Sequence, residues 1–521
     1  MIIRTILTMI CFCPAFLLAL RRNLHMFQLN GYKNDEHFRW ITKNLRQQLL
    51  LFFALGAGIL RILFPVAGFD IALWVLSFLI FLEYRAMMRL YAKKKLVYTA
   101  RVKRLIVTCF AVLALVIALT WACAGFSVVS GVLGVMLCAA IFLPLLSNLI
   151  NHPLEWGIRQ YYFHDAKRIL RNEPDLKIIG ITGSFGKTSV KYYLKTLLSG
   201  HFRVLATPGN FNTPLGVTIT VREHLKPGTE VFLCEMGARR VGEIKELCDL
   251  VHPECGIITA VGPQHLETFH SIENIRNTKF ELADAVKGKG PVFLNGDNDL
   301  IREKAPEYGN RVMYFSGPSE GIGYYAKDVA VSRQGTEFTV VSPDGEAERF
   351  RMRLIGSHNV INVVGSIAVA NRLGIPLSEL VIPVRRLCPV EHRMELKEHG
   401  EVTIIDDAYN SNPVGSKAAV ETLKEFPGIR ILITPGMVEL GEKEAEYNRK
   451  FGTYAAACCD YIFLVGKKKT EPIRDGILSC GFPEKKCVSC DTLEEAMSLA
   501  YAVKEEGHKY ILLENDLPDN Y

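Results

Sequence analysis

The sequence predicts an α/β protein in which a helical, membrane-type segment precedes two domains of alternating strands and helices. Two observations carry this prediction: the long apolar runs lie within the first 150 residues, and short β-rich runs alternate with helical segments after them. Such alternation favours parallel sheets joined by crossover connections. Because 521 residues exceed one ordinary core, we expect membrane helices over 1–150, a central domain over 151–385 and a C-terminal domain over 386–521.

Five apolar runs make up the N-terminal part. A spanning helix needs about 20 apolar residues, so the last two runs are the strongest candidates, whereas the second and third could form one re-entrant hairpin. The first run has the length of a signal-peptide core. Arg21 and Arg22 follow it in place of a small-residue cleavage site, which favours an uncleaved anchor. The runs are Ile6–Leu20, Leu49–Val66, Ile71–Leu82, Leu105–Ala124 and Val128–Ile150.

The charge distribution predicts the orientation of these helices. Residues 1–104 contain 16 Lys and Arg against 4 Asp and Glu, whereas the rest of the chain is mildly acidic. Most of the basic residues lie in 21–47 and 85–104, and cytoplasmic loops carry such an excess. Five spans would then place the N-terminus outside and residue 151 onward in the cytoplasm; alternatively, some helices lie on the membrane surface. This charge pattern does not indicate nucleic-acid binding.

The cysteines indicate a reducing compartment. Fourteen are scattered without an even framework, and several lie in the apolar runs. Cys487 and Cys490, with Cys480 upstream, form the one suggestive spacing. A structural zinc ion requires four ligands, and no fourth is evident, so ordinary reduced thiols are favoured over a redox or metal site.

Short apolar runs mark the strands of both expected domains. In the central domain, helices should cover Ser189–Leu198 and Asn362–Leu373, the latter ended by Gly374 and Pro376. The break between the domains is expected near 380–395. The expected strands are Lys177–Thr182, Glu230–Glu235, Cys255–Thr259 and Pro291–Asn295 in the central domain, and Val402–Asp406, Arg430–Thr434 and Tyr461–Val465 in the C-terminal domain.

A glycine loop between a strand and a helix is the sharpest motif. Glycines let the backbone wrap phosphate oxygens, and a helix N-terminus offers free N–H groups and a positive dipole end. Lys187 can neutralise the β- and γ-phosphates, and the Thr188 hydroxyl can ligate Mg²⁺. The loop is not a full Walker A sequence because Ile181 stands at its first glycine position, and a chance Gly-Lys-Thr turn is the alternative. The expected nucleotide-binding residues are Gly183, Ser184, Gly186, Lys187, Thr188 and Ser189.

Three further residues extend this candidate site. Glu235 ends the next apolar strand, where a carboxylate sits on the ligand side of a parallel sheet; it is a candidate Mg²⁺ ligand, or else a surface glutamate. His265 follows another strand in the same domain. A lone histidine is usually structural, but this position makes it a candidate ligand. Lys279 follows 14 residues later.

The order of these motifs resembles that of the Mur ligase family. The resemblance covers about residues 175–470 and includes Glu235-Met-Gly-Ala and the spacing of His265 and Lys279. The Asp406–Pro413 and Gly436–Gly441 segments look most like the MurF branch. The remaining motifs are Asn295-Gly-Asp-Asn-Asp, Gly356-Ser-His-Asn359-Val-Ile-Asn362 and Glu391-His-Arg393-Met-Glu.

The resemblance implies a P-loop-type ATPase domain, a Rossmann-like C-terminal domain and an ATP-dependent ligase that forms amide bonds through an acyl phosphate. Lys187, His265 and Lys279 would be the catalytic residues. Thr188 and Glu235 would hold one Mg²⁺, and His265 with a carbamylated Lys279 a second; an unmodified Lys279 could only contact phosphate. Asn295 and Asn359 would lie near adenine, and Arg393 and Asp406 would contact the nucleotide after domain closure.

The resemblance leaves the substrates open. The MurF branch adds D-alanyl-D-alanine to a UDP-linked muramoyl peptide, but here membrane helices replace the N-terminal domain that recognises the UDP end. The amine donor is expected to be an amino acid or dipeptide, and the acid to be UDP-linked or lipid-linked, at the bacterial cell membrane with cytoplasmic catalytic domains. A ligase of the poly-γ-glutamate or folylpolyglutamate type and a non-catalytic nucleotide-dependent membrane scaffold are the alternatives.

Overall fold

The computed structural model describes residues 2–90, 95–286, 290–317, 321–332, 335–409 and 411–516. The chain forms two compact units, which divide between Tyr161 and Tyr162. Two of the basic residues expected in a cytoplasmic loop, Lys93 and Lys94, lie outside the described residues, as does Asn410. Each unit is considered by itself.

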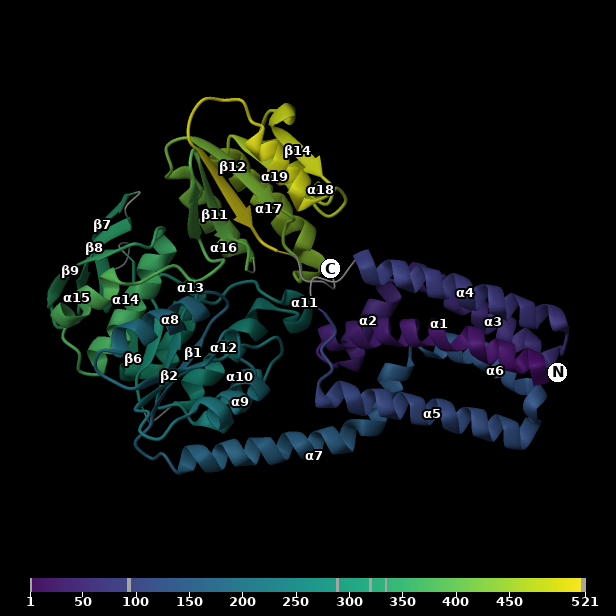
Figure 1. Ribbon diagram of the computed structural model, residues 1–521. Helices are drawn as coiled ribbons and strands as arrows, with labels where there is room; N and C mark the ends of the chain where they lie inside the picture. Colours follow the sequence, from purple (N-terminus) through teal and green to yellow (C-terminus); the bar gives the residue numbers. More distant parts are fainter. Residues whose placement is uncertain are drawn as a thin grey trace. The chain divides into compact units, whose positions relative to one another are not determined.

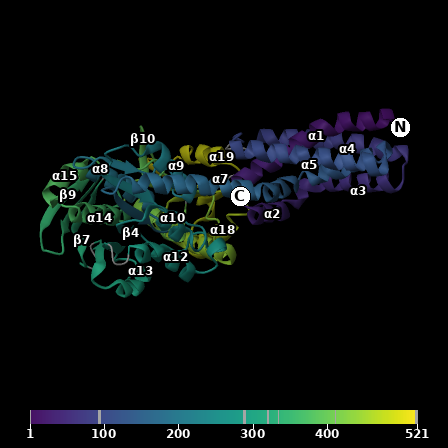
Figure 2. The ribbon, with the colours of Figure 1, turned by 90° about the horizontal axis from the view of Figure 1, so that it is seen from below.

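The N-terminal unit is helical. Helices α1, α3, α4 and α5 run side by side in both ribbon views (Figures 1 and 2). The shorter α2 and a 3₁₀ turn, η1, connect α1 to α3. The elements are α1 (Ile2–Leu29), α2 (Asn34–Lys43), η1 (Leu45–Gln48), α3 (Leu49–Leu63), α4 (Ala67–Leu90), α5 (Ala100–Ala124), α6 (Phe126–Ala139) and α7 (Leu143–Arg171).

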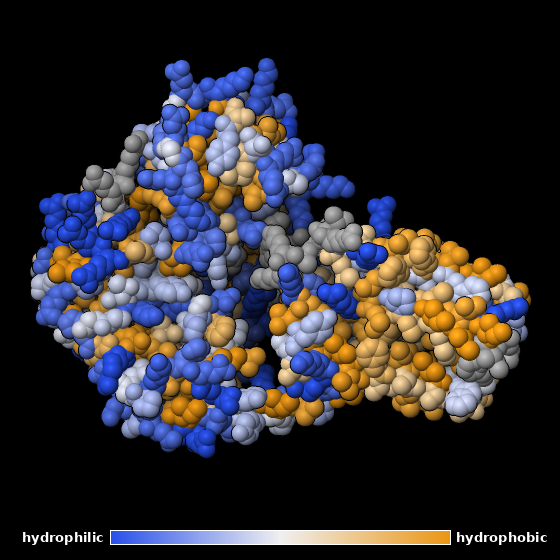
Figure 3. Space-filling view, viewed as in Figure 1, coloured by the Kyte–Doolittle hydropathy of each residue, from blue (hydrophilic) through white to orange (hydrophobic). Residues whose placement is uncertain are grey.

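Four described helical segments are long and apolar enough to cross a membrane: Ile3–Leu29, Leu45–Leu63, Ala67–Met88 and Ala100–Ala124. The second and third predicted runs therefore form separate helices of spanning length. The fifth predicted run is broken, because Val128–Ala139 and Leu143–Arg171 are bent by 79° where they meet; together they would bring the number to five. In Figure 3, apolar side chains gather over the visible surface of this unit.

Small residues and a buried ion pair contribute to the packing of the helices in this unit. A Cβ added at Gly58 of α3 would lie only 2.6 Å from the carbonyl oxygen of Gly131 in α6, so these backbones approach closely. Arg61 Nε donates to Asp70 Oδ1 at 2.8 Å, and both side chains are buried. The pairing offsets the cost of burying each charge alone.

The larger unit, Tyr162–Leu517, contains two sheets. The first has nine strands in the order β2-β3-β1-β4-β5-β6-β7-β8-β9. It is parallel from β2 to β7, and β7, β8 and β9 are antiparallel. The strands are β1 (Lys177–Thr182), β2 (Val204–Ala206), β3 (Val231–Glu235), β4 (Cys255–Ile258), β5 (Val292–Asn295), β6 (Val312–Ser316), β7 (Tyr324–Ser332), β8 (Gly335–Val341) and β9 (Ala347–Met352).

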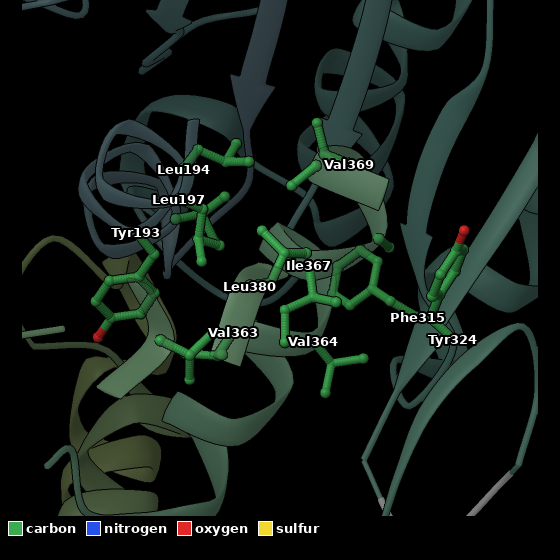
Figure 4. Packing of buried hydrophobic residues seen from close by; sticks show 14 of the residues in the cluster. Tyr193, Leu194, Leu197, Phe315, Tyr324, Val363, Val364, Ile367, Val369 and Leu380 are labelled. Atoms are coloured by element: carbon green, nitrogen blue, oxygen red, sulfur yellow. The ribbon is translucent and has the colours of Figure 1, made fainter. Parts of the chain in front are cut away.

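Helices cover both faces of this sheet. On one face, Leu194 and Leu197 of α8 pack with Val363 and Ile367 of α14 (Figure 4). On the other, Leu282 of α12 packs under β1 and β4. The helices are α8 (Lys187–Leu198), α9 (Pro214–His224), α10 (Glu243–Val251), α11 (Leu266–Phe269), α12 (Ile272–Ala285), α13 (Asp299–Lys304), η2 (Ala305–Arg311), α14 (Ser357–Arg372) and α15 (Leu377–Arg385).

The second sheet has the order β10-β11-β15-β12-β13-β14, with only β10 antiparallel to its described neighbour. Apolar clusters lie on both of its faces. Its elements are β10 (Glu395–His399), β11 (Val402–Asp407), α16 (Pro413–Lys424), β12 (Ile429–Thr434), η3 (Gly441–Lys443), α17 (Glu444–Cys458), β13 (Tyr461–Val465), α18 (Glu471–Ser479), η4 (Glu484–Lys486), β14 (Cys487–Cys490), α19 (Leu493–Tyr501) and β15 (Lys509–Glu514).

Most predicted strands lie within a residue of their observed bounds, but the sheets are not wholly parallel. The β7–β9 segment was not predicted; its strands are joined by short connections, which permit only antiparallel pairing. The suggestive cysteine spacing makes no common site: Cys487 and Cys490 of β14 belong to the clusters on opposite faces of the sheet, and Cys480 is exposed. All fourteen cysteines are free thiols.

Candidate active site

The candidate site lies where the carboxyl ends of three neighbouring strands meet. Strand β1 lies between β3 and β4, parallel to both. The glycine loop follows β1, Glu235 ends β3, and His265 follows β4. The connection after β1 leads to β2 on one side and the connection after β4 leads to β5 on the other, and ligands of open α/β sheets bind at such a position.

Two glycines shape the phosphate loop. Gly183 and Gly186 have φ of 152° and 83°, in the range that side chains avoid. A Cβ on Gly186 would lie 2.7 Å from Asn362 Oδ1, and one on Gly183 would overlap Thr259. Ser184 fixes the loop from beneath, because its backbone N–H donates to Ala260 O at 2.7 Å and its hydroxyl to Gly262 O at 2.9 Å.

Lys187 begins helix α8 and folds back over the loop. Its Nζ donates to the carbonyl oxygens of Gly183 at 2.5 Å and Ser184 at 3.2 Å. Burial lowers the pKa of Lys187 to about 8, with the Glu235 carboxylate opposing this shift. Anionic phosphates in the loop would be better partners for this ammonium than two carbonyl dipoles. Thr188 and Ser189, both buried, follow in the first turn of α8.

Glu235 is the most constrained carboxylate of the site. Its Oε1 accepts hydrogen bonds from Thr188 Oγ1 at 3.0 Å and Asn212 Nδ2 at 3.1 Å, and Lys191 Nζ lies 2.9 Å from its Oε2. Burial would raise the pKa of Glu235, but the ammonium groups of Lys191 and Lys187 hold it below its usual value. The hydroxyl of Thr188 beside an ionised carboxylate is an oxygen pair of the kind that Mg²⁺ binds, so these residues fit that ion.

His265 and Lys279 lie on the other side of the loop. His265 has φ of 52° and its Nδ1 bonds to the carboxylate of Glu439, which follows β12 in the second sheet domain. Lys279, in α12, is buried, and its Nζ lies 5.8 Å from the centre of the Phe269 ring. Burial and the nearby charge of Lys187 lower the pKa of Lys279 to about 7. Burial lowers the pKa of His265, and the charge of Lys279 adds to this shift.

The two asparagines expected near adenine have internal partners. Asn295 Nδ2 donates to Thr259 O at 2.8 Å, and its Oδ1 accepts from the N–H of Asp297. Asn359 Oδ1 accepts from the Tyr193 hydroxyl at 2.9 Å, and its Nδ2 donates to Ile355 O at 2.8 Å. Both amides therefore have hydrogen-bond partners within the central domain, and adenine contact by either stays a prediction.

The C-terminal residues expected to reach the nucleotide differ in their surroundings. The guanidinium of Arg393 stacks 4.4 Å from the centre of the Tyr409 ring. Its charge contributes to the lowered pKa values of Lys187 and His358. Arg393 therefore lies near the loop. Asp406 instead has partners in its own domain: Lys397 Nζ at 2.5 Å and His392 Nδ1 at 2.8 Å.

Three residues of the site were not predicted from the sequence. Lys191 lies on the buried face of α8, three positions after Thr188, and a charged residue on such a face was the available signal. Asn212 contacts Glu235 from the loop before α9, and no local pattern marks it. Glu439 lies in the Gly436–Gly441 motif, but the sequence did not indicate that its carboxylate bonds to His265.

A glycine loop at a helix start, with a buried acid, a histidine and a lysine of lowered pKa beside it, is the arrangement expected of a nucleotide-dependent enzyme of the α/β class. Two family matches make this specific. Residues 181–370 match the Mur ligase middle domain, and residues 392–513 match the Mur ligase glutamate ligase domain. The chain belongs to the Mur ligase family, and it is an ATP-dependent ligase that joins a carboxylate to an amine.

Individual relatives point to one branch. The chain is 32% identical to the UDP-N-acetylmuramoyl-tripeptide–D-alanyl-D-alanine ligase of Bacillus subtilis, over 66% of this chain and 73% of that protein. The ligase of the same name from Escherichia coli is 30% identical, over 61% and 73%. MurF ligase from Thermotoga maritima, solved in complex with ADP, superposes with a TM-score of 0.62 and 25% identity, over 69% of this chain and 80% of that structure.

Proposed function

We propose that the enzyme joins the amino group of D-alanyl-D-alanine to the terminal carboxylate of a muramoyl peptide in cell-wall synthesis. The names of the relatives support the substrates, and the buried Thr188–Glu235 pair beside the phosphate loop supports the ATP chemistry. A carboxylate oxygen of the peptide attacks the γ-phosphorus of ATP, and ADP leaves. The amine then attacks the acyl carbon, the amide forms, and phosphate and a proton are released.

The residues of the loop serve the first step by position and charge. In this proposal Lys187 leaves the carbonyls of Gly183 and Ser184 and contacts the β- and γ-phosphates. The backbone N–H groups at the start of α8 would donate hydrogen bonds to phosphate oxygens. Arg393 approaches from the C-terminal domain, and closure of that domain excludes water from the acyl phosphate.

Two Mg²⁺ ions belong to this proposal. Thr188 and Glu235 would hold one, and His265 with Lys279 the other; bound there, they would neutralise charge that develops on the transferred phosphoryl group. Lys279 would bind as a carbamate, formed when its neutral amine attacks CO₂ and a proton is released. A pKa of about 7 for Lys279 favours this modification, because much of the amine is unprotonated at neutral pH.

The N-terminal unit is proposed to anchor the enzyme in the bacterial cell membrane. Five spans, with the bent pair α6–α7 as the fifth and the basic segments 21–47 and 85–104 inside, would place both ligase domains in the cytoplasm. The proposed domain limits are 1–150 for the anchor, 151–385 for the ATP-binding domain and 386–521 for the C-terminal domain. The α7 helix, Leu143–Arg171, spans the proposed boundary between the anchor and the ATP-binding domain.

The anchor allows two forms of the acid substrate. A helical bundle in place of a UDP-recognising domain favours a lipid-linked peptide, whereas the relatives' names favour a UDP-linked one. The test offers both to the full-length protein in nanodiscs, with D-alanyl-D-alanine, and measures phosphate release. Faster release with the lipid-linked peptide would support the membrane substrate; release with the UDP-linked peptide alone would leave the helices as a simple anchor.

The same assay tests the ligase proposal itself. Phosphate release should require both an acid and an amine, and Lys187→Ala should abolish it. Lys195→Ala is the matched control, because Lys195 lies on the exposed face of the same helix. Phosphate release that does not depend on the amine, or that persists in the Lys187→Ala variant, would contradict the proposed site.

A further inference from the structure

The carboxylate proposed to hold Mg²⁺ has a fixed cation beside it. Lys191 is fully buried, and its Nζ lies 2.9 Å from Glu235 Oε2 and donates to Gly209 O at 2.6 Å. This lysine would oppose metal binding, because an ammonium repels a divalent cation at the same carboxylate.

The loop that holds the Lys191 ammonium also holds the Glu235 carboxylate. Gly209 belongs to the loop that follows β2, and two other residues of that loop also hold Glu235: Asn212 donates to its Oε1, and the Thr207 hydroxyl accepts from its backbone N–H at 3.2 Å. The loop, Lys191 and Glu235 therefore form one connected cluster. Because Lys191 is fully buried, its ammonium could leave Glu235 only if the surrounding loop moved.

The charge balance of the cluster is positive before any ligand binds. Lys191 lies against Glu235, and the charge of Lys187 in the neighbouring loop also acts on this carboxylate, so the cluster holds two ammonium groups and one carboxylate. A free divalent cation would enter a site whose net charge is already +1. The complex of Mg²⁺ with ATP carries a net charge of −2, and its phosphates would contact Lys187 directly.

We propose that Lys191 is a positioning residue that closes Glu235 to free divalent cations, so that the site accepts the metal only together with nucleotide phosphates. The ammonium neutralises the buried carboxylate in the empty enzyme, which would otherwise carry an unpaired buried charge. Because the ammonium lies against Oε2, a metal ion held with the Thr188 hydroxyl would bind at Oε1, in exchange for the hydrogen bonds that this oxygen now accepts from Thr188 and Asn212. This inference rests on the proposed function, in which Thr188 and Glu235 hold Mg²⁺.

Mn²⁺ provides the test, because its sharp paramagnetic resonance signal is lost on binding. The full-length protein in detergent is titrated with Mn²⁺, with and without a non-hydrolysable ATP analogue. The wild-type Glu235 site should bind Mn²⁺ only with the analogue. Lys191→Gln removes the charge but keeps a donor for Gly209 O, and it should tighten nucleotide-free Mn²⁺ binding by about tenfold or more. Lys191→Arg, which restores the charge, should return binding to the wild-type level.

Two controls separate the possible failures. The double variant Lys191→Gln/Glu235→Gln should lose the added nucleotide-free binding, which assigns it to Glu235. If Glu235→Gln alone leaves nucleotide-dependent Mn²⁺ binding intact, Glu235 is not a metal ligand and the proposed function of this residue fails. If Glu235→Gln abolishes that binding but Lys191→Gln gains none without nucleotide, only the present inference fails.

A second measurement does not depend on how well the Lys191 variants fold. Thermal unfolding of the wild-type protein should be unchanged by Mn²⁺ alone and shifted upward by Mn²⁺ with the ATP analogue. A shift with Mn²⁺ alone that disappears in Glu235→Gln would mean that the wild-type carboxylate is open to the free ion, and it would overturn the proposal.

Discussion

The hydrogen bond between His265 and Glu439 gives the sharpest prediction about catalysis. Glu439 accepts from Nδ1 of His265, and its backbone carbonyl accepts from the N–H of Glu267 at 3.2 Å. The bond to Nδ1 leaves Nε2 of His265 with its lone pair, as a metal ligand requires. Glu439 therefore orients His265 from the C-terminal domain, and the bond forms only when the two domains are in this arrangement.

The Glu439→Gln variant keeps the size of the side chain and removes its charge. Burial would raise the pKa of Glu439, but His265 and the charge of Arg239 hold it below its usual value, so the wild-type group is ionised at neutral pH. A hydrogen bond to a charged group contributes about 1.5–3 kcal/mol, which is a factor of about 10–150. Arg239 adds little, since it is half exposed and 3.5 Å away.

The assay is phosphate release that depends on acid and amine, with nucleotide affinity measured separately. We expect kcat/KM of Glu439→Gln to fall by a factor in that range. ATP affinity should change by less than about twofold, since the described contacts of Glu439 are to His265, Glu267 and Arg239 and not to the phosphate loop. Glu442→Gln, an exposed neighbour, is the matched control. Activity of Glu439→Gln above half that of wild type would refute the reasoning, and an equal loss in Arg239→Gln would assign the effect to the ion pair.

Three further predictions concern the metal, the lysine and stability. Thr188→Val removes the hydroxyl beside Glu235 at constant shape, and it should weaken Mg²⁺ activation of phosphate release by about tenfold. Lys279→Arg should abolish turnover, because arginine stays protonated and cannot form a carbamate; removal of CO₂ should lower wild-type activity, and bicarbonate should restore it. Burial raises the pKa of Glu514 to about 7 from 4.5, so the folded protein holds this proton longer than the unfolded chain. Stability should therefore fall by up to about 3 kcal/mol between pH 4.5 and 7, and Glu514→Gln should flatten this part of the profile of melting temperature against pH.

Local signals were sufficient for the phosphate loop and the strands that carry it. The observed β1 and β13 have the bounds expected from their apolar runs, and helix α8 begins at Lys187, two residues before the expected start. Loop and helix follow directly along the chain, so neighbouring residues determine their conformation. The family resemblance was likewise readable from ordered motifs, and the family matches confirm it.

The sequence was less informative where the physical cause is not local. The residue pattern over 324–352 did not predict that β7–β9 extend the central sheet in antiparallel order. Their pairing depends on the edge that β6 presents, which local sequence does not determine. The bend between α6 and α7 interrupts an apolar run that composition alone presents as continuous.

By itself, the sequence determined the class of the protein: membrane-length helices, two α/β domains, a phosphate loop and the residue types of an ATP-dependent ligase. Only the tertiary structure decided which groups meet. Glu235 and Lys191 are 44 positions apart, and His265 and Glu439 are 174 apart. Their charges act on each other because parallel strands bring their carboxyl ends to one edge and because the two sheet domains contact there; burial then removes the water that would screen them.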